Sequence, residues 1–383
     1  MFNMFGDYKL RIIHTSDWHI GRFLNGYSLL EDQSYFLNWL VDILRNENVD
    51  VLIVSGDIYN TASPSAACVS LLDEFLCKVV LELKKTVLLI AGNHDSPEKL
   101  GFSSRMLEKS GLIISTNLKD IRNVILKTSP FSIGVTLFPF ISIAAVKEIF
   151  KEEKVTNFDM AAQLIYENII KNIAKCDVNI LCAHGLFLGE NGSLNYCDSE
   201  LAVGGLDVAS LKRFKYFSYV ALGHLHGFQS AGSNGFYCGS PLKYSVSEAS
   251  HKKRLILLDV KDSGSIKIEH IFVEPKRDLI VKEGEFKNLL NIKTDDFVSV
   301  KLTDDNFVID PYSRLKKNMP NILEISYSNI NIKGCKNFKI SREKPIDVLF
   351  EEFYNAVVGR DMNILERDLL KSVLNEVNEE NLT

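Results

Sequence analysis

The sequence lacks the features that mark membrane and secreted proteins. No segment approaches the run of roughly 20 apolar residues that a membrane-spanning helix needs. The N-terminus, MFNMFGDYKL, has neither the basic start nor the sustained apolar run of a signal peptide. The seven cysteines are scattered and form no Cys-x-x-Cys pair. We therefore expect a protein of the reducing cytoplasm with no membrane segment.

The sequence also lacks an excess of positive charge. It has 44 Lys and Arg against 49 Asp and Glu, so the formal net charge is −5. A protein that holds DNA through its surface alone usually shows a basic excess. If the substrate is a phosphodiester, its attraction to this chain must be local, and bound metal ions are the natural source of that charge.

What the sequence does contain, over its first 110 residues, is an alternation of strands and helices. Apolar runs predict strands at 9–13, 49–54 and 86–90, and helical periodicity predicts helices at 32–46, 64–83 and 97–110. The order β-α-β-α-β-α argues for a layered α/β domain. At 383 residues, the chain is long enough for one large domain and a smaller one.

The same kind of pattern continues to about Pro275, where its character changes. We predict strands within 125–143, at 177–184 and from 219, a helix at 158–174, a loop over the site at 185–205, a strand and turn at 236–241, and a hairpin of 254–260 with 265–273. The predicted domains are a main domain of residues 1–275, a small second domain of residues 276–341, and C-terminal helices within 342–383, separated at Gly359.

Polar clusters follow the predicted strands at the points where they end. Five such clusters occur, and they are Asp17-x-His19, Gly56-Asp57, Gly92-Asn93-His94-Asp95, His184-Gly185 and Gly223-His224-x-His226. In open α/β sheets, ligand sites lie beyond the carboxyl ends of the strands. The stretch TVLLIAGNHD at 86–95 is the clearest example, because a buried strand stops at a glycine and presents an amide, an imidazole and a carboxylate.

The clusters offer the mixed nitrogen and oxygen ligands that suit manganese, iron or zinc. Seven candidate ligands are too many for one ion, whereas two ions ~3.5–4 Å apart would use them to activate a nucleophile and clamp an in-line displacement. Asp57 is the natural bridge, because it stands alone at its strand end. In an extended chain, alternate side chains point to the same side. Asp17 and His19 can therefore reach the same small volume, and so can His224 and His226. Gly56, Gly92 and Gly223 permit close approach of the backbone.

Each cluster taken alone has an ordinary structural explanation. Gly56-Asp57 is typical of a turn, and Asp17-x-His19 of a capping residue followed by a surface histidine. The conjunction of five clusters in chain order favours the metal site. Four residues outside the clusters are assigned to packing or to the surface, with a supporting contact left open for the first, and they are His14, Trp18, His251 and His270.

At these clusters the sequence resembles the calcineurin-like metallophosphoesterases. The segments HTSDWHIG, SGDIYNTASP, AGNHDS, ALGHLH and GSP look most like the SbcD branch of that family, and they cover residues 14–241. The resemblance implies an α/β fold with a layered β-sandwich core and helices on its outer faces. It also implies a small α+β capping domain and partner-binding C-terminal helices.

The resemblance also implies roles for individual residues. Asp17, His19, Asp57 and His226 would hold one metal ion, and Asn93, His184 and His224 would complete the second around Asp57. His94 would contact the phosphate and assist the leaving oxygen, with Asp95 orienting it. The implied metal is Mn²⁺, two ions per chain. The implied partners are DNA, an SbcC-type coiled-coil ATPase, and a second copy of the chain in a heterotetramer.

The implied activity is that of a metal-dependent DNA exonuclease and endonuclease, acting on DNA ends and hairpins in repair, recombination and replication. One alternative is a phosphomonoesterase or nucleotidase on the same site, since a fold does not settle the substrate class. Another is a scaffold whose metal site is vestigial. An apolar stripe in the tail either binds the partner or packs on the capping domain, and it comprises Ile346, Leu349, Phe350, Phe353 and Val357.

Overall fold

The computed structural model describes residues 9–128, 131–189, 194–197, 208–261, 264–328 and 346–380. The chain divides into two compact units. One unit consists of Met1–Lys282, Lys293–Val300 and Lys316–Glu324, and the other of Glu283–Ile292, Lys301–Leu315 and Ile325–Thr383. The candidate site lies in the first unit.

Two six-stranded sheets form the core of the first unit. The first sheet has the order β16-β15-β1-β4-β5-β6. Strands β1, β4, β5 and β6 are parallel, and β15 runs antiparallel to both of its neighbours, β1 and β16. Its strands are β1 (Lys9–Thr15), β4 (Val51–Ser55), β5 (Thr86–Ile90), β6 (Leu112–Ser115), β15 (Arg254–Lys261) and β16 (Ile266–Phe272).

The second sheet has the order β13-β14-β12-β9-β8-β7. Strands β8, β9, β12 and β14 are parallel, and both edge strands are antiparallel to their neighbours. Its strands are β7 (Arg122–Thr128), β8 (Phe131–Phe138), β9 (Val178–His184), β12 (Tyr219–Gly223), β13 (Gln229–Ser230) and β14 (Gly235–Tyr237).

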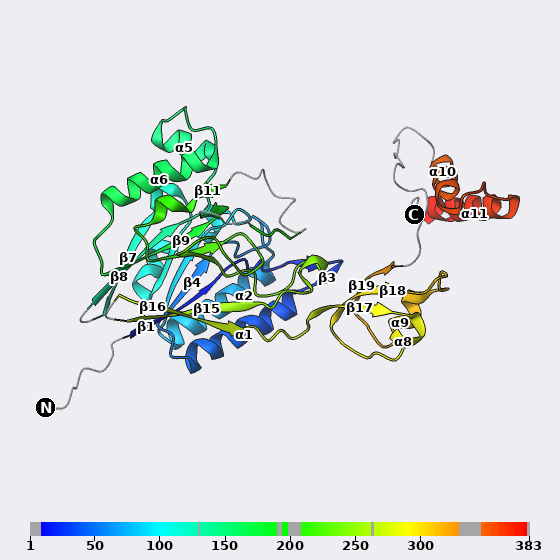
Figure 1. The fold of residues 1–383 in the computed structure, drawn as a ribbon, viewed down its shortest axis with the longest axis horizontal. Coiled ribbons are helices and arrows are strands. Elements are labelled where there is room, and N and C mark those ends of the chain that lie inside the picture. Colours follow the sequence, from blue (N-terminus) through cyan, green and yellow to red (C-terminus); the bar gives the residue numbers. More distant parts are fainter. Residues whose placement is uncertain are drawn as a thin grey trace. The chain divides into compact units, whose positions relative to one another are not determined.

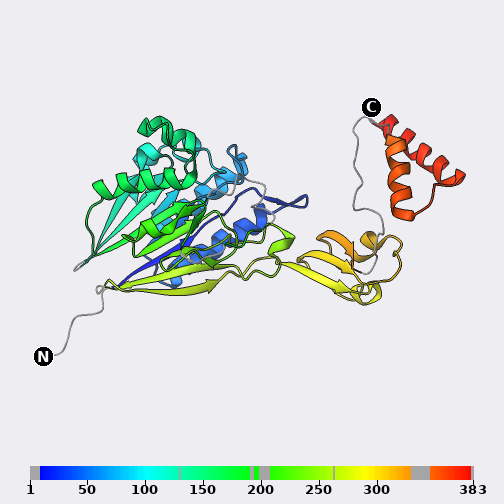
Figure 2. The same cartoon turned by 45° about the horizontal axis from the view of Figure 1, so that its top comes forward.

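Helices cover the outer faces of the two sheets (Figure 1, Figure 2). Successive residues of β4 show the layering, because Ile53 points into the cluster between the sheets while Leu52 and Val54 pack outward under α1 and α2. On the far side, α5 and α6 cover the second sheet. The predicted β-sandwich core with helices outside is confirmed. The principal helices are α1 (Leu30–Asn46), α2 (Ala66–Leu76), α5 (Ile143–Phe150) and α6 (Phe158–Asn172).

The helix predicted at 64–83 begins later and changes type. Ser65, in an extended conformation, accepts a hydrogen bond from the Cys68 backbone N–H and caps α2, so Pro64 lies before the helix. After Leu76 the chain continues as a π-helix, η1 (Cys77–Glu82). The apolar spacing survives this change, because Val79 and Phe75 both remain buried against the first sheet.

The helix predicted at 97–110 is wrong as a single element. The segment forms α3 (Pro97–Leu100), α4 (Ser104–Leu107) and a 3₁₀ turn, η2 (Glu108–Ser110). Ser103 interrupts it with a φ of +59°, a value that no α-helix accommodates. Sequence reasoning also missed α5 and the short strand β6, although Ser142 caps α5 and Gly111 precedes β6 with a φ of +100°.

Short elements complete the first unit. Two small two-stranded sheets pair β2 with β3 and β10 with β11. The remaining elements are β2 (Phe23–Leu24), β3 (Tyr27–Ser28), β10 (Phe187–Leu188), β11 (Ala209–Ser210), and the turns η3 (Leu118–Asp120), η4 (Leu211–Phe214) and η5 (Val246–Glu248). Most of the predicted loop at 185–205 lies outside the described residues.

The C-terminal part of the chain contains a three-stranded sheet, of order β17-β18-β19, and two longer helices. The predicted boundaries of a capping domain and tail stay a prediction, and residues 329–345 lie outside the described residues. Within the part of the chain that the structure describes, every helix is too short or too polar to cross a bilayer. The C-terminal elements are β17 (Leu279–Gly284), α8 (Phe286–Leu289), β18 (Phe297–Leu302), α9 (Pro311–Leu315), β19 (Ile322–Tyr327), α10 (Ile346–Val358) and α11 (Ile364–Glu380).

Candidate metal centre

The carboxyl ends of the central strands of both sheets meet at one place. In the first sheet, the Asp17 and His19 backbone N–H groups donate to the carbonyls of Gly56 and Asp57, at 3.0 and 2.9 Å. Across the sandwich, His184 Nδ1 at the end of β9 lies 2.7 Å from the carbonyl oxygen of Ser55 at the end of β4. Strand ends that are remote in sequence therefore share one small volume, as the sequence predicts.

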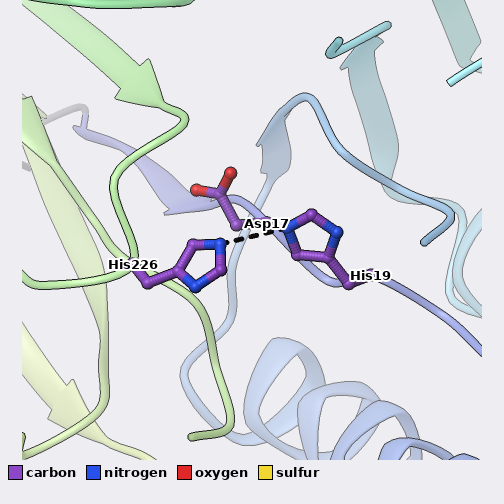
Figure 3. Close-up of side chains that lie close together, drawn as sticks. All are labelled: Asp17, His19 and His226. Atoms are coloured by element: carbon purple, nitrogen blue, oxygen red, sulfur yellow. Dashed lines mark hydrogen bonds between the residues drawn. The ribbon is translucent and has the colours of Figure 1, made fainter. Parts of the chain in front are cut away.

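One group of side chains in this volume consists of Asp17, His19 and His226 (Figure 3). Their potential ligand atoms all lie within 4.8 Å of one another. The Nε2 atoms of His19 and His226 are 3.1 Å apart, and all three side chains are buried. Two imidazole nitrogens and a carboxylate facing one point are a donor set that suits a divalent metal ion.

A second group consists of Asp57, His184 and His224. Asn93 completes it, because its Oδ1 lies 3.0 Å from His184 Nε2 and 2.9 Å from His224 Nδ1. All seven predicted ligands therefore come together in two adjacent groups.

Asp57 lies between the two groups. Its Oδ2 is 3.5 Å from His184 Nε2 and 3.6 Å from His19 Nε2, so one carboxylate oxygen faces a histidine of each group. This is the position that a bridging carboxylate needs. The residues present therefore fit two divalent ions, with nitrogen and oxygen donors only.

Four of the candidate ligands have a left-handed backbone conformation. The φ angles are +54° at Asp17, +44° at His19, +51° at Asp57 and +110° at His224. Such conformations are uncommon for residues with side chains, and they persist where surrounding structure enforces them, often at functional sites. The backbone is thus bent so that consecutive ligands turn inward, a feature that the sequence pattern did not reveal.

The close approach predicted at three glycines is present at all three, and a Cβ on Gly223 would lie 1.9 Å from the Ser55 carbonyl oxygen. Gly56 has a φ of +87°, and a Cβ there would overlap the His184 ring. A Cβ on Gly92 would overlap the Asp57 carboxylate and backbone nitrogen. Any larger residue at Gly56 or Gly92 would displace a candidate ligand.

Burial and neighbouring charges shift the ionisation of the site in the absence of metal. Burial raises the pKa of Asp17 to about 7. Burial also acts to raise the pKa of Asp57, but the positive charge of His184 and its hydrogen bond outweigh it, so that pKa lies below its ordinary value. In return, Asp57 overcomes the burial effect on His184 and raises the pKa of that imidazole to about 9. Negative charge therefore concentrates on Asp57, between the two groups.

His94 lies at the accessible side of the site. Asn93, His94 and His224 are half-buried, whereas Asp17, His19 and Asp57 are buried. The His94 backbone N–H donates to Asp57 Oδ1 at 2.9 Å. His94 also belongs to a third group of potential ligands with His19 and Asp57. Its contacts with the ligands are therefore close, and its role as a non-ligand stays a prediction.

The contacts of Asp95 differ from the predicted ones. Its carboxylate accepts hydrogen bonds from the backbone N–H groups of Ile58, Tyr59 and Gly92, at 3.1, 2.9 and 2.9 Å. His94 Nδ1 lies instead 3.0 Å from the carbonyl oxygen of Asn60. Sequence reasoning missed Asn60 because a backbone carbonyl leaves no signal in residue type.

A second carboxylate escaped sequence reasoning altogether. Glu248 is buried with 0% of its surface exposed, and its Oε1 lies 3.3 Å from His226 Nδ1. It follows no predicted strand, so only its position in the fold reveals it.

Four residues were assigned to packing or to the surface, and the structure shows how far each is buried. Trp18 is buried against Phe36 and Phe75. His14 is buried beside Tyr219, His251 is half-buried and His270 is exposed.

Comparisons with known proteins show the family to which the chain belongs. A family model described as calcineurin-like phosphoesterase matches residues 10–228. The SbcD subunit of the nuclease SbcCD from Staphylococcus epidermidis is 32% identical over 376 residues, which cover 95% of this chain and 98% of that protein. Among solved structures, TT1561 of Thermus thermophilus matches with a TM-score of 0.40 and 11% identity, over 70% of this chain and 100% of that chain. The chain therefore belongs to the calcineurin-like phosphoesterases, in the SbcD family of nuclease subunits.

Proposed function

We propose that this chain is a metal-dependent DNA phosphodiesterase with exonuclease and endonuclease activity. The observation that carries the proposal is the convergence of seven donor residues, with Asp57 between the other six. The chain's relative is named as a nuclease subunit, which supports a nucleic acid as the substrate class, and we propose DNA. Processing of DNA ends and hairpins in repair and recombination is the proposed role.

The proposed cofactor is a pair of divalent ions, Mn²⁺ in the first instance. Asp17, His19, Asp57 and His226 would hold one ion, and Asp57, Asn93, His184 and His224 the other. When bound, such ions lower the pKa of water towards ~7 and neutralise charge on a phosphate. They would supply the positive charge that the chain's −5 balance lacks.

His94 is the proposed proton donor to the leaving oxygen. The leaving group of a DNA phosphodiester is a sugar alkoxide, which departs poorly without a proton. His94 is half-buried at the accessible side of the site, and its ring centroid lies 4.8 Å from that of His19. Since Nδ1 lies 3.0 Å from the Asn60 carbonyl oxygen and would donate its N–H there, the proton for the leaving oxygen would come from Nε2 of the doubly protonated imidazolium.

Asp95 has a different proposed task from the one that sequence reasoning gave it. Its carboxylate holds the backbone N–H groups of Ile58, Tyr59 and Gly92, which flank Asp57 and Asn93. We propose that Asp95 fixes the two loops that present these ligands, and that Asn60 orients His94.

The C-terminal helices are the proposed site of partner binding. Apolar side chains of α10 are exposed, with 67% of Ile346, 44% of Phe350 and 45% of Phe353 accessible. Leu349 is half-buried, and Val357 lies outside the described side chains. Apolar faces of this kind suit a groove on a partner protein. The relative's name denotes one subunit of a complex, and we propose an SbcC-type ATPase as the partner, with this chain as a homodimer inside a heterotetramer.

The domain organisation that goes with this function is also a proposal. Residues 1–275 would carry catalysis, residues 276–341 would form a capping domain, and residues 342–383 would bind the partner.

The deciding experiment is cleavage of labelled DNA by the purified chain with added Mn²⁺. A duplex, a hairpin and a small phosphomonoester are incubated in parallel, with a chelator and with the Asp57→Ala variant as controls. DNA cleavage that both controls abolish is the expected result.

Two other outcomes would replace the proposal. Turnover of the phosphomonoester alone would identify a phosphatase. Absence of turnover, also with an SbcC-type partner and ATP present, would identify a scaffold with a vestigial site.

A further inference from the structure

We propose that Glu248, held by Lys253 and Ser240, is a positioning residue for the candidate ligand His226. This inference rests on the metal site proposed above and adds residues outside the seven donors. It also accounts for the segment Gly239-Ser240-Pro241, which belongs to the sequence motifs but had no role assigned to it.

The first observation is the contact behind the His226 ring. Its Nε2 faces His19 in the site, while its Nδ1 lies 3.3 Å from Glu248 Oε1 on the opposite side. A carboxylate that accepts the far N–H of a metal-binding histidine fixes the tautomer and makes the imidazole a stronger ligand.

Within the described residues, the other candidate histidine ligands have no such carboxylate. His184 Nδ1 faces the backbone carbonyl of Ser55, whereas His224 Nδ1 faces the candidate ligand Asn93 inside the site. His19 Nδ1 is buried without a hydrogen-bond partner in the part of the chain that the structure describes. Glu248 thus distinguishes His226, and with it the group of Asp17, His19 and His226.

The second observation is that the Glu248 carboxylate is buried and paired with a cation, which stabilises its ionised form. Glu248 is 0% exposed, and its Oε2 lies 2.5 Å from Lys253 Nζ, whose side chain is itself 7% exposed. Buried charges persist when they are paired and their remaining hydrogen-bonding groups are satisfied. A charged Lys253 beside Glu248 meets this condition.

The third observation is that the ammonium of Lys253 makes all of its hydrogen bonds within this cluster. Besides Glu248, its ammonium donates to the carbonyl of His226 at 2.9 Å and to Ser240 Oγ at 2.8 Å. An ammonium has three N–H donors, and all three are used here. Lys253 therefore has a structural role, because it has no N–H donor left to bind a substrate phosphate.

The turn at 239–241 holds the backbone of the same histidine. The Ser240 N–H donates to the His226 carbonyl at 3.1 Å, so that carbonyl receives both Ser240 and Lys253. Gly239 has a φ of +84°, and a Cβ there would lie 2.5 Å from the His226 oxygen. Ring and backbone of His226 are thus fixed by a single cluster.

The test is a Mn²⁺ titration by calorimetry on the full chain, after the metal has been removed. The variants are Glu248→Gln, which keeps the shape and removes the charge, and the double variant Glu248→Gln with Lys253→Met. The double variant replaces a buried ion pair by uncharged groups of similar size, a change that folded proteins often tolerate. In the single variant Lys253 is left buried without its partner, and this can prevent folding. The double variant then still allows the inference to be tested.

Asp259→Asn is the matched control. It breaks the largely buried pair of Arg11 and Asp259, which are 2.8 Å apart at the start of β1, the opposite end of that strand from Asp17. All titrations are run well below the thermal midpoint of each variant, so that a general loss of stability does not enter the binding constant.

We expect one ion to bind ~10–100-fold more weakly in both Glu248 variants, with the other ion unchanged. Asp259→Asn should match the wild type. Raised Mn²⁺ should restore cleavage by Glu248→Gln at a temperature where the metal-free variant is already fully folded, so that the rescue reports metal binding and not stabilisation of the fold. Wild-type affinity for both ions in a folded Glu248 variant would overturn the inference alone. Failure of the wild type to bind Mn²⁺ would instead overturn the proposed function.

Discussion

The Nε2 atoms of His19 and His226 face each other at 3.1 Å, although 207 residues separate them in the chain. Both rings are buried, and Asp17 lies beside them (Figure 3). Two imidazole nitrogens at this distance need something positive between them, either a proton on one ring or a cation shared by both. The two nitrogens are within hydrogen-bonding distance, so one ring can donate an N–H to the other, whereas the proposed function requires a cation between them.

The first prediction concerns metal removal. The proposed site would bind Mn²⁺ only in the folded chain, because its ligands are dispersed in the unfolded one. Mn²⁺ at 100 times its dissociation constant should then raise the free energy of unfolding by ~2.7 kcal/mol per site. Thermal unfolding with Mn²⁺ and with chelator measures this difference. In His226→Asn the rise should be smaller, whereas in the control His270→Asn, an exposed histidine of β16, it should equal that of the wild type.

The second prediction concerns His94. His94→Gln should keep the metal content of the wild type and lower the turnover of DNA by ~10²–10⁴-fold, since only the proton donor is lost. Metal analysis and single-turnover cleavage on the same preparation give both quantities. Loss of metal would show instead that His94 is itself a ligand, together with His19 and Asp57, and would contradict its role as proton donor.

The third prediction separates two roles for Asp95. Asp95→Ala should lower the free energy of unfolding by several kcal/mol, because the N–H groups of Ile58, Tyr59 and Gly92 lose a buried acceptor worth about 1–3 kcal/mol each. Urea unfolding of the metal-free protein measures it. A variant of unchanged stability with an altered pH profile of cleavage would favour the role of orienting His94.

The fourth prediction concerns acid stability and His14. Burial lowers the pKa of His14 from 6.5 to about 3, while its Nδ1 lies 2.9 Å from Tyr219 Oη. Between these values the unfolded chain binds the proton and the folded chain does not. His14 therefore stabilises the fold fully above pH 6.5 and progressively less as the pH falls toward 3, by up to ~1.4 kcal/mol per pH unit.

Urea unfolding of metal-free protein at pH 7 and 5.5 tests this sign. The wild type should lose on the order of 1 kcal/mol more than His14→Gln over this interval. Equal losses in the two proteins would mean that His14 is protonated in the folded state or titrates normally there.

The fifth prediction concerns the tail. Deletion of residues 342–383 should abolish association with an SbcC-type partner and leave metal-dependent cleavage intact. Phe350→Asp, on the exposed face of α10, should weaken association by ~2 kcal/mol or more if this residue is a buried anchor in the complex. The control is Ile125→Asp, on β7, where 43% of the side chain is exposed. Unchanged association after the deletion would refute the proposed binding site.

Sequence reasoning located the candidate ligands well because their order along the chain follows the order of strand ends. Asp17, Asp57 and Asn93 each follow a buried parallel strand, and this places them at one edge of a sheet. The meeting with His184 required the second sheet, which the sequence suggested only through a further apolar strand ending in histidine.

What the sequence could not supply are features that depend on tertiary contacts. Glu248 supports His226 from a 3₁₀ turn 22 residues further along the chain, with no periodicity to mark it. The π-helical turn after Leu76 preserves apolar spacing while changing the backbone, so periodicity did not detect it. The interruption at Ser103 lies where the apolar side chains of Phe102 and Met106 are exposed, so their spacing did not report a helix. The left-handed conformations at Asp17 and Asp57 are enforced by neighbours, since neither residue type requires them.

The distribution of the donors over both sheets has a consequence for the timing of biosynthesis. His19 emerges early from the ribosome, but its partner His226 is added 207 residues later. At about 5–20 residues per second, that interval lasts roughly 10–40 seconds. During this time the nascent chain holds only part of the donor set, so it cannot assemble the cleavage machinery before the second sheet has been translated and docked. Enzyme activity would thus begin only once the whole core has folded, and half-made chains would be harmless to DNA.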